Sequence, residues 1–225
     1  MSVEIFNCEQ NTPEWEDLRR GLVTASELDT VIAQGRKKGE PSVTRRRYLM
    51  RLAAERCGAA PAESYTNSHM ERGHLLEGDA KNLYSFMTDE EPEPVGFIRN
   101  GEMGCSPDSL VRDTGLLEVK TKLPHIQLEV ILSGQIPPEH IPQIQGQMWI
   151  AEREFVDFVS FWPGLPLFVR RIHRDEPYIR KLSDAVDAFN AELAETVERV
   201  RRYSGSPGAD LHAALVASLQ EGAAA

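Results

Sequence analysis

The feature that most constrains the fold is a change of hydrophobic period between residues 87 and 95. From about Met70 to Met87, apolar residues recur at helical spacing, and Glu77 lies near the middle of this segment. The face expected to be buried consists of Leu75, Leu76, Ala80, Leu83, Tyr84 and Met87. From residue 95, short apolar runs are separated by the turn sequences Asn100-Gly101 and Asp113-Thr114-Gly115, which predict an antiparallel meander. Such a chain must pack helices against a sheet.

The rest of the sequence fits the same architecture. Further helices are predicted from Pro13 to about Arg20, after Thr24, from Thr44 to Cys57, twice between Pro124 and Ala151, and from Pro177 to about Tyr203. Strands are predicted over residues 155–161 and 167–172. The segment Thr24-Ala25-Ser26-Glu27 has the spacing of a capping box, in which the threonine side chain closes the start of a helix. We therefore expect an α/β or α+β fold, with a central mixed β-sheet flanked by helices.

Size and composition indicate one domain. The 225 residues, 41% of them hydrophobic, can bury one sizeable core. We expect a single domain over residues 1–203, followed by a loosely attached tail over residues 204–225. The apolar stretches are shorter than the roughly 18 residues that a membrane span needs. Cys8, Cys57 and Cys105 lack the spacing of a disulfide framework or a thiolate metal cluster. A cytoplasmic protein with no membrane partner is expected.

The charge of the chain is unevenly distributed. The formal net charge of −10 argues against broad, nonspecific adhesion to nucleic acid. Between Asp17 and Arg51, however, there are nine basic residues and only four acidic ones. This segment is either an ordinary solvated helix and loop or a surface that contacts phosphates on a protein that otherwise repels DNA.

Asp108, Glu118 and Lys120 form the candidate catalytic group. Side chains two residues apart share a face of a strand, so Glu118 and Lys120 point together from the apolar strand 116–121. Asp108 lies ten residues before Glu118 with the Asp-Thr-Gly turn between them, so neighbouring strands can bring the two carboxylates together. Paired carboxylates suit Mg²⁺ or Mn²⁺, and a lysine beside them can orient water or neutralise charge on a phosphate. With Pro107, the pattern matches the PD…(D/E)-x-K signature of metal-dependent nucleases.

The same residues also have a purely structural interpretation. An ordinary hairpin with Asp, Glu and Lys on a solvated outer face would also contain this short pattern. The sequence has no HExxH, zinc-finger, GxSxG, Walker or dinucleotide-binding motif, so other common catalytic chemistries find little support.

Five ordered motifs extend the nuclease pattern along the chain. They are WEDLRRGLVTASE at residues 15–27, RGHLLEGDA at 72–80, CSPDSL at 105–110, LEVK at 117–120 and QIQGQMW at 143–149. In these motifs the chain resembles the lambda exonuclease, or YqaJ-type viral recombinase, family of the PD-(D/E)-x-K nuclease superfamily, over about residues 10–200. The resemblance implies a restriction-endonuclease-like core.

The resemblance also implies roles for individual residues. The catalytic residues would be Asp108, Glu118, Lys120, Glu77 and Gln143, and the metal ligands would be Asp108, Glu118, Glu77 and the main-chain carbonyl of Val119. The 5′ phosphate of a DNA end would be held by Arg19, Thr24 and Ser26, with Arg36 contacting the substrate from a basic loop. A guanidinium, hydroxyls and a helix start are suitable donors to a phosphate.

The expected function follows from the same resemblance. It implies a Mg²⁺-dependent 5′→3′ exonuclease that degrades one strand of linear double-stranded DNA and leaves 3′ overhangs for recombination by strand annealing. It further implies a homotrimeric ring around the duplex and a single-strand annealing partner, in a bacterial or phage-infected cell. Two alternatives stay open: an endonuclease of the same superfamily, acting in repair or restriction, and a noncatalytic DNA-binding module with the same fold.

Overall fold

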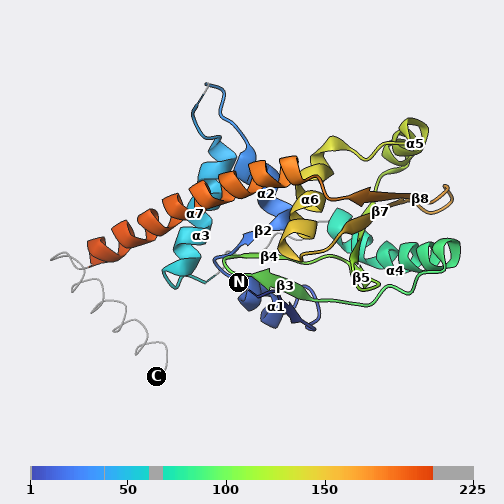
Figure 1. Cartoon of the computed structure of the whole chain (residues 1–225), viewed down its shortest axis with the longest axis horizontal. Coiled ribbons are helices and arrows are strands. Elements are labelled where there is room, and N and C mark those ends of the chain that lie inside the picture. The colour runs from blue at the N-terminus through green and yellow to red at the C-terminus, as the bar shows by residue number, and fades with distance from the viewer. Residues whose placement is uncertain (1, 38, 61–67, 205–225) are drawn as a thin grey trace.

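Two four-stranded mixed sheets surrounded by helices make up the fold (Figure 1). The computed structural model describes residues 2–37, 39–60 and 68–204, and of residues 68–74 and 204 it describes the backbone alone. The predicted fold class, a mixed sheet flanked by helices, is confirmed, with the sheet divided in two. Apart from Ser204, the tail expected over residues 204–225 lies outside the described residues.

The first sheet has the strand order β1-β3-β4-β2. Its strands are β1 (Glu4–Phe6), β2 (Val23–Thr24), β3 (Phe97–Asn100) and β4 (Met103–Cys105). The predicted Asn-Gly hairpin joins β3 to β4, and Gly101 adopts a φ of 63° that a glycine accepts without strain. β2 runs parallel to β4, with Thr24 paired to Gly104.

The second sheet has the strand order β5-β6-β7-β8. Its strands are β5 (Ser109–Val111), β6 (Gly115–Thr121), β7 (Phe155–Phe161) and β8 (Phe168–His173). β5 and β6 form the second predicted hairpin, whereas β6 and β7 are parallel. The expected meander is therefore two hairpins, one in each sheet. Every residue of β7 is buried, as expected for a strand that is covered on both faces.

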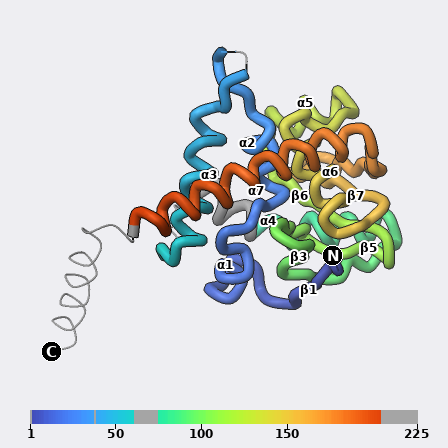
Figure 2. The backbone as a smooth tube through the Cα atoms, turned by 60° about the vertical axis from the view of Figure 1, so that its left-hand side comes forward, coloured from blue at the N-terminus to red at the C-terminus, as the bar shows by residue number. Residues whose placement is uncertain are grey.

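Helices cover both faces of the second sheet. The α-helices are α1 (Pro13–Arg19), α2 (Leu28–Ile32), α3 (Val43–Arg56), α4 (Ser68–Thr88), α5 (Pro124–Ser133), α6 (Ile141–Ile150) and α7 (Glu176–Ser204), and the 3-10 helices are η1 (Ala25–Glu27) and η2 (Pro138–His140). One core joins α2, α3, α6 and α7 to one face of this sheet, and a smaller core lies between α4 and the other face. Figure 2 shows α7 crossing α2, α3 and α6, which it contacts. Within the described ranges, no helix is long and apolar enough to cross a bilayer.

The apolar face of α4 is narrower than the sequence predicts. Ala80 and Tyr84 are fully buried against the second sheet, and Leu76 packs beside them. Leu75, Leu83 and Met87 were expected in the same face, but they are 80%, 41% and 59% exposed. The correction has a geometric reason, because only residues spaced by four along one side of the helix reach the sheet.

The capping box predicted at Thr24 is not formed. Thr24 precedes η1 with an extended backbone, but its side chain makes no capping hydrogen bond. Its hydroxyl lies 3.3 Å from the hydroxyl of Ser26. The chain enters α2 through a 3-10 turn, so the hydroxyls of Thr24 and Ser26 share one side of the turn.

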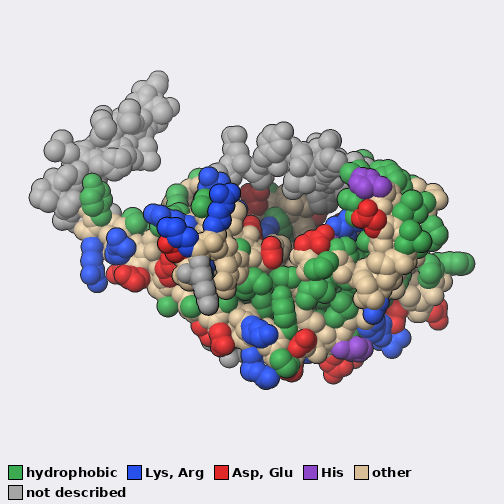
Figure 3. Space-filling model, turned by 90° about the horizontal axis from the view of Figure 1, so that it is seen from above, with side chains coloured by type: hydrophobic (Ala, Val, Ile, Leu, Met, Phe, Trp, Pro, Cys, Tyr) green, Lys and Arg blue, Asp and Glu red, His purple; other side chains and the backbone are tan. Residues whose placement is uncertain are grey.

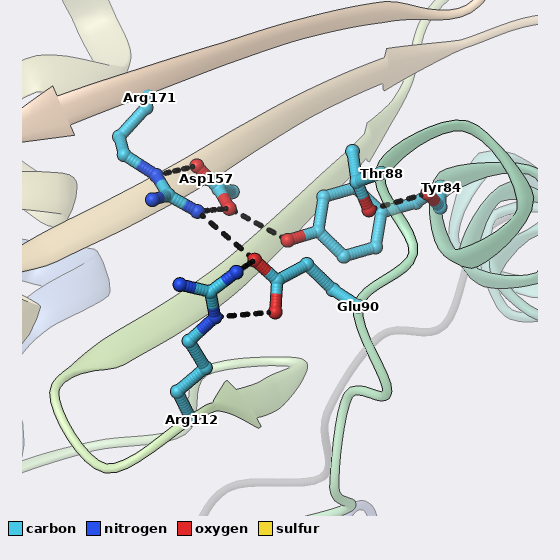
Figure 4. Close-up of polar contacts among 6 residues, drawn as sticks. All are labelled: Tyr84, Thr88, Glu90, Arg112, Asp157 and Arg171. Atoms are coloured by element: carbon cyan, nitrogen blue, oxygen red, sulfur yellow. Dashed lines mark hydrogen bonds and ion pairs between the residues drawn. The ribbon is translucent and has the colours of Figure 1, made fainter.

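A buried polar network fixes the C-terminal half of α4 to the second sheet (Figure 4). The Tyr84 hydroxyl donates to Asp157 Oδ2 at 2.6 Å, and the Arg171 guanidinium donates to both oxygens of Asp157 at 2.8 and 2.7 Å. Glu90, which follows α4, accepts from Arg112 Nε at 2.7 Å. Asp157 is 2% exposed, so its charge is stabilised by these partners rather than by water.

Candidate active site

One cavity of about 430 Å³ brings together most of the predicted site residues. Its lining includes the predicted metal-binding and catalytic residues Glu77, Asp108, Glu118, Val119, Lys120 and Gln143. It also includes the predicted phosphate-binding residues Arg19, Thr24 and Ser26. Arg36 does not line this cavity and is exposed in the loop between α2 and α3. Predicted residues as far apart in sequence as Arg19 and Gln143 thus share one site, because α1, η1, α4, β6 and α6 converge on it.

The β5–β6 hairpin places Asp108 beside Glu118, as the spacing predicts. Asp108 lies immediately before β5, and its main-chain N–H donates to the Leu117 carbonyl at 3.0 Å. Its carboxylate atom Oδ2 accepts from the Val119 N–H at 2.6 Å. Leu117 and Val119 face the core beneath α4, whereas Glu118 and Lys120 point into the cavity. The alternation along β6 therefore separates an apolar face from a chemical one.

Glu118 is almost fully buried, and both of its carboxylate oxygens have partners. Oε1 accepts from Gln143 Nε2 at 2.7 Å and from Lys120 Nζ at 2.5 Å, and Oε2 accepts from Gln147 Nε2 at 2.6 Å. Gln147 was not predicted. Its position four residues after Gln143 could have revealed it, because residues with this spacing share one face of a helix.

Lys81 is a second residue that the sequence analysis missed. Its ammonium lies 2.6 Å from Glu77 Oε1 and donates to the main-chain carbonyl of Asp108 at 2.6 Å. The helical spacing of Glu77 and Lys81 signals an ion pair, but it does not indicate that the lysine also reaches Asp108. This link joins α4 to the hairpin that carries the other carboxylates.

Electrostatics in the cavity are dominated by three nearby carboxylates. Burial raises the pKa of Asp108 well above its ordinary value, and the charges of Glu118 and Glu77 raise it further. Burial lowers the pKa of Lys120, but the carboxylates of Glu118 and Asp108 outweigh this effect and the net shift is upward. Lys120 is thus an ammonium that donates to Glu118. The carboxylates repel one another, and a bound cation would reduce this repulsion.

The oxygen-rich lining fits a hard divalent cation. Asp108, Glu118 and Glu77 line the same cavity, as does Val119. Among the described residues, no group of three or more Asp, Glu, His or Cys side chains is arranged so that it could hold a metal ion by itself. An open arrangement of this kind suits Mg²⁺, which keeps several waters and uses few carboxylates together with substrate phosphates.

The same cavity also contains donors to an anion. Arg19 stacks on the ring of Trp15 at 3.8 Å, and Trp15 Nε1 donates to Ser106 Oγ at 2.9 Å. Within the described part of the chain, Arg19 forms no ion pair with a carboxylate. The hydroxyls of Thr24 and Ser26 lie in the same lining. An unpaired guanidinium and two hydroxyls can bind a phosphate together.

The basic segment from Asp17 to Arg51 is partly neutralised. Among its described residues, four basic side chains form ion pairs. The pairs are Arg20–Asp17, Lys37–Glu40, Arg45–Glu192 and Arg51–Glu27. Figure 3 shows basic groups next to acidic ones on the face in view, rather than one continuous basic surface. The segment is therefore a mixed surface in which Arg19 differs from its neighbours by facing the cavity.

Comparison with known proteins identifies a family for this chain. The model of the YqaJ-like viral recombinase domain matches residues 14–154. The chain is similar to an alkaline exonuclease (LHK-Exo) from Laribacter hongkongensis, whose crystal structure superposes with a TM-score of 0.77. The two sequences are 34% identical, and the matched region covers 86% of this chain and 98% of LHK-Exo. LHK-Exo in complex with dAMP is 35% identical over the same shares, with a TM-score of 0.78.

A more distant structure shares the fold. The phage related exonuclease from Haemophilus somnus 129PT is 18% identical, with a TM-score of 0.59, and covers 82% of this chain and 99% of its own. No curated protein matches the chain. Since the domain model spans more than half of the sequence and the LHK-Exo similarity spans most of it, the chain belongs to the YqaJ-like viral recombinase family.

Proposed function

We propose that this protein is a metal-dependent exonuclease that degrades one strand of linear double-stranded DNA from 5′-phosphorylated ends. Membership of a viral recombinase family and the similarity to an alkaline exonuclease support a recombination-related exonuclease. One observation carries the finer proposal. A single cavity contains the carboxylates and lysine of a nuclease site together with two hydroxyls and an arginine that, among the described residues, forms no ion pair.

The proposed cofactor is Mg²⁺, with Mn²⁺ as a possible substitute. Asp108, Glu118, Glu77 and the carbonyl of Val119 would hold it, in a PD-(D/E)-x-K site. When bound, it supplies a more acidic water and a positive charge next to the scissile phosphate. Lys120 neutralises charge that develops on that phosphate, and Gln143 holds Glu118 in place through its 2.7 Å hydrogen bond.

End selection is assigned to Arg19, Thr24 and Ser26. The stacking of Arg19 on Trp15 presents its guanidinium to the cavity, where it can bind a terminal phosphate through two hydrogen bonds. A 5′ phosphate held by these groups would place the next phosphodiester near the carboxylates, which gives 5′→3′ polarity. Arg36, outside the cavity, is proposed to contact DNA farther along the duplex.

The product is proposed to be a 3′ overhang that passes to a single-strand annealing protein. A net charge of −10 would repel DNA from most of the surface. A homotrimeric ring around the duplex would retain the substrate by topology instead. Sedimentation of the purified protein tests the trimer, and copurification with the annealing protein encoded beside it tests the partner. A monomer, or the absence of any complex, would remove the respective claim.

The function is tested by digesting linear duplex labelled at the 5′ or 3′ end, with Mg²⁺ or EDTA, beside covalently closed circles. Early release of the 5′ label, dependent on metal and sparing circles, is the expected result. Cleaved circles would favour the endonuclease alternative. Binding to DNA ends without cleavage of any substrate would favour a noncatalytic module.

A further inference from the structure

Gln147 contacts the catalytic residue Glu118 but has no assigned role. It is 1% exposed and lines the cavity. Its side-chain N–H donates to Oε2 of Glu118 at 2.6 Å, and no other hydrogen bond to that oxygen is found among the described residues. The other oxygen of Glu118 is shared by Gln143 and Lys120. The orientation of the Glu118 carboxylate is therefore fixed at both of its oxygens.

The helix that carries Gln147 is itself held firmly. Gly146 packs so closely against α2 that a Cβ atom at this position would lie 2.1 Å from Leu28 Cδ1. On another side of α6, Gln145 donates to the His173 carbonyl at 3.0 Å and accepts from the Asp175 N–H at 2.8 Å. Because α6 is fixed at these two contacts, the amide of Gln147 has a defined position relative to β6.

The side-chain carbonyl of Gln147 indicates why a glutamine occupies this position. Its Oε1 atom is buried and has no hydrogen-bond partner among the described residues. A buried acceptor without a donor is unfavourable, and an apolar side chain of similar size would avoid the loss. The contact that an apolar side chain could not provide is the hydrogen bond to Glu118.

We propose that Gln147 is a positioning residue that orients the Glu118 carboxylate for metal binding. This inference rests on the proposed function and deepens it. With Gln147 present, Oε2 is held in place, and Oε1 stays within reach of Lys120 and Gln143. Without it, the carboxylate rotates about its terminal bond and presents its oxygens to the metal position in several orientations.

The test uses Gln147→Met, which keeps a similar length and volume but lacks the N–H. Mn²⁺ binding is measured on the full-length protein without DNA, by the loss of the free-ion signal in electron paramagnetic resonance. We expect binding to weaken about 10–100-fold, the range typical for loss of a group that orients a metal ligand. The rate at saturating DNA should fall with little change in KM, and the thermal midpoint should fall by only a few degrees, because Oε2 of Glu118 loses its hydrogen bond.

Gln145→Met is the matched control. This buried glutamine lies on the same helix, and its hydrogen bonds support α6 without touching Glu118. Loss of these two hydrogen bonds in Gln145→Met should lower the thermal midpoint and leave the affinity for Mn²⁺ unchanged. A merely structural role for Gln147 would give the same pattern in both variants.

The outcomes separate the inference from the proposed function. If the wild type binds Mn²⁺ and cleaves DNA while Gln147→Met binds the ion equally well, the positioning role is wrong and the function stands. If both variants lose affinity in proportion to lost stability, the positioning role is also wrong. A wild type that neither binds Mn²⁺ nor cleaves DNA overturns the proposed function, and this inference with it.

Discussion

Replacing Tyr84 with phenylalanine isolates the hydrogen bond that fixes α4 to the second sheet. Tyr84 is fully buried, and its hydroxyl donates to Asp157 Oδ2 at 2.6 Å (Figure 4). Tyr84→Phe keeps the ring and creates no large cavity, so the change in stability reports the hydroxyl alone. Asp157 retains both hydrogen bonds from Arg171, so its charge stays paired in the variant.

The magnitude follows from the kind of bond that is lost. A hydrogen bond to a charged group contributes about 1.5–3 kcal/mol to the free energy of unfolding. For a chain of this size, each kcal/mol corresponds to about 2–4 °C, so the thermal midpoint should fall by about 3–12 °C. The lower part of this range is expected because Arg171 still holds the carboxylate.

Alkaline pH offers a second measurement on the same variant. Burial, with the hydrogen bond to Asp157 and its charge, raises the pKa of Tyr84 above its ordinary value of 10.0. Above pH 10 the unfolded chain loses this proton while the folded protein keeps it, so the unfolded state is favoured as pH rises. The stability advantage of the wild type over Tyr84→Phe is thus present in full below pH 10 and decreases above it.

The assay is urea unfolding followed by circular dichroism at pH 7 and at several values above 10. Tyr203→Phe is the control, because Tyr203 is 79% exposed and its substitution should change stability by less than about 0.5 kcal/mol. If Tyr84→Phe is as stable as the wild type at pH 7, or if the difference grows above pH 10, the network does not anchor α4 as argued.

Two further predictions concern the cavity and a third concerns the packing of α6 against α2. Lys120→Ala should reduce Mg²⁺-dependent cleavage by about 10²–10³-fold or more, because charge on the scissile phosphate loses the ammonium proposed to neutralise it. Lys181→Ala should act like the wild type, because Lys181 is exposed on α7 and does not line the cavity. Equal digestion rates would exclude a catalytic role for Lys120. Arg19→Gln should reduce the preference for 5′-phosphorylated over 5′-hydroxyl ends by about 10–100-fold, with Arg20→Gln as the control because Arg20 is already paired with Asp17. An unchanged preference in competition digests would place end recognition elsewhere. Gly146→Ala should lower the free energy of unfolding by about 1–3 kcal/mol, since the added Cβ would lie 2.1 Å from Leu28 Cδ1. An unfolding curve that matches the wild type would show that α2 can move away.

Local patterns in the sequence were sufficient for most helices, for the two hairpins and for the central pair of carboxylates, but not for the short strands β1 and β2. The long amphipathic helix, the two hairpins and the burial of one face of β6 follow from periodicity and turn residues, which act over a few positions. The hairpin register then places Asp108 beside Glu118, because an antiparallel turn brings residues on either side of it together. The assignment of roles drew on the family resemblance as well.

The tertiary structure decided how distant segments combine. It divided the sheet in two, left Leu83 of α4 exposed, and prevented the capping box at Thr24. It also brought Gln147 and Lys81 to the carboxylates, neither of which the sequence analysis identified. The physical reason is that turn and periodicity signals report interactions within one element. Contacts between elements depend on how closely their surfaces pack, which is settled only when the whole core forms.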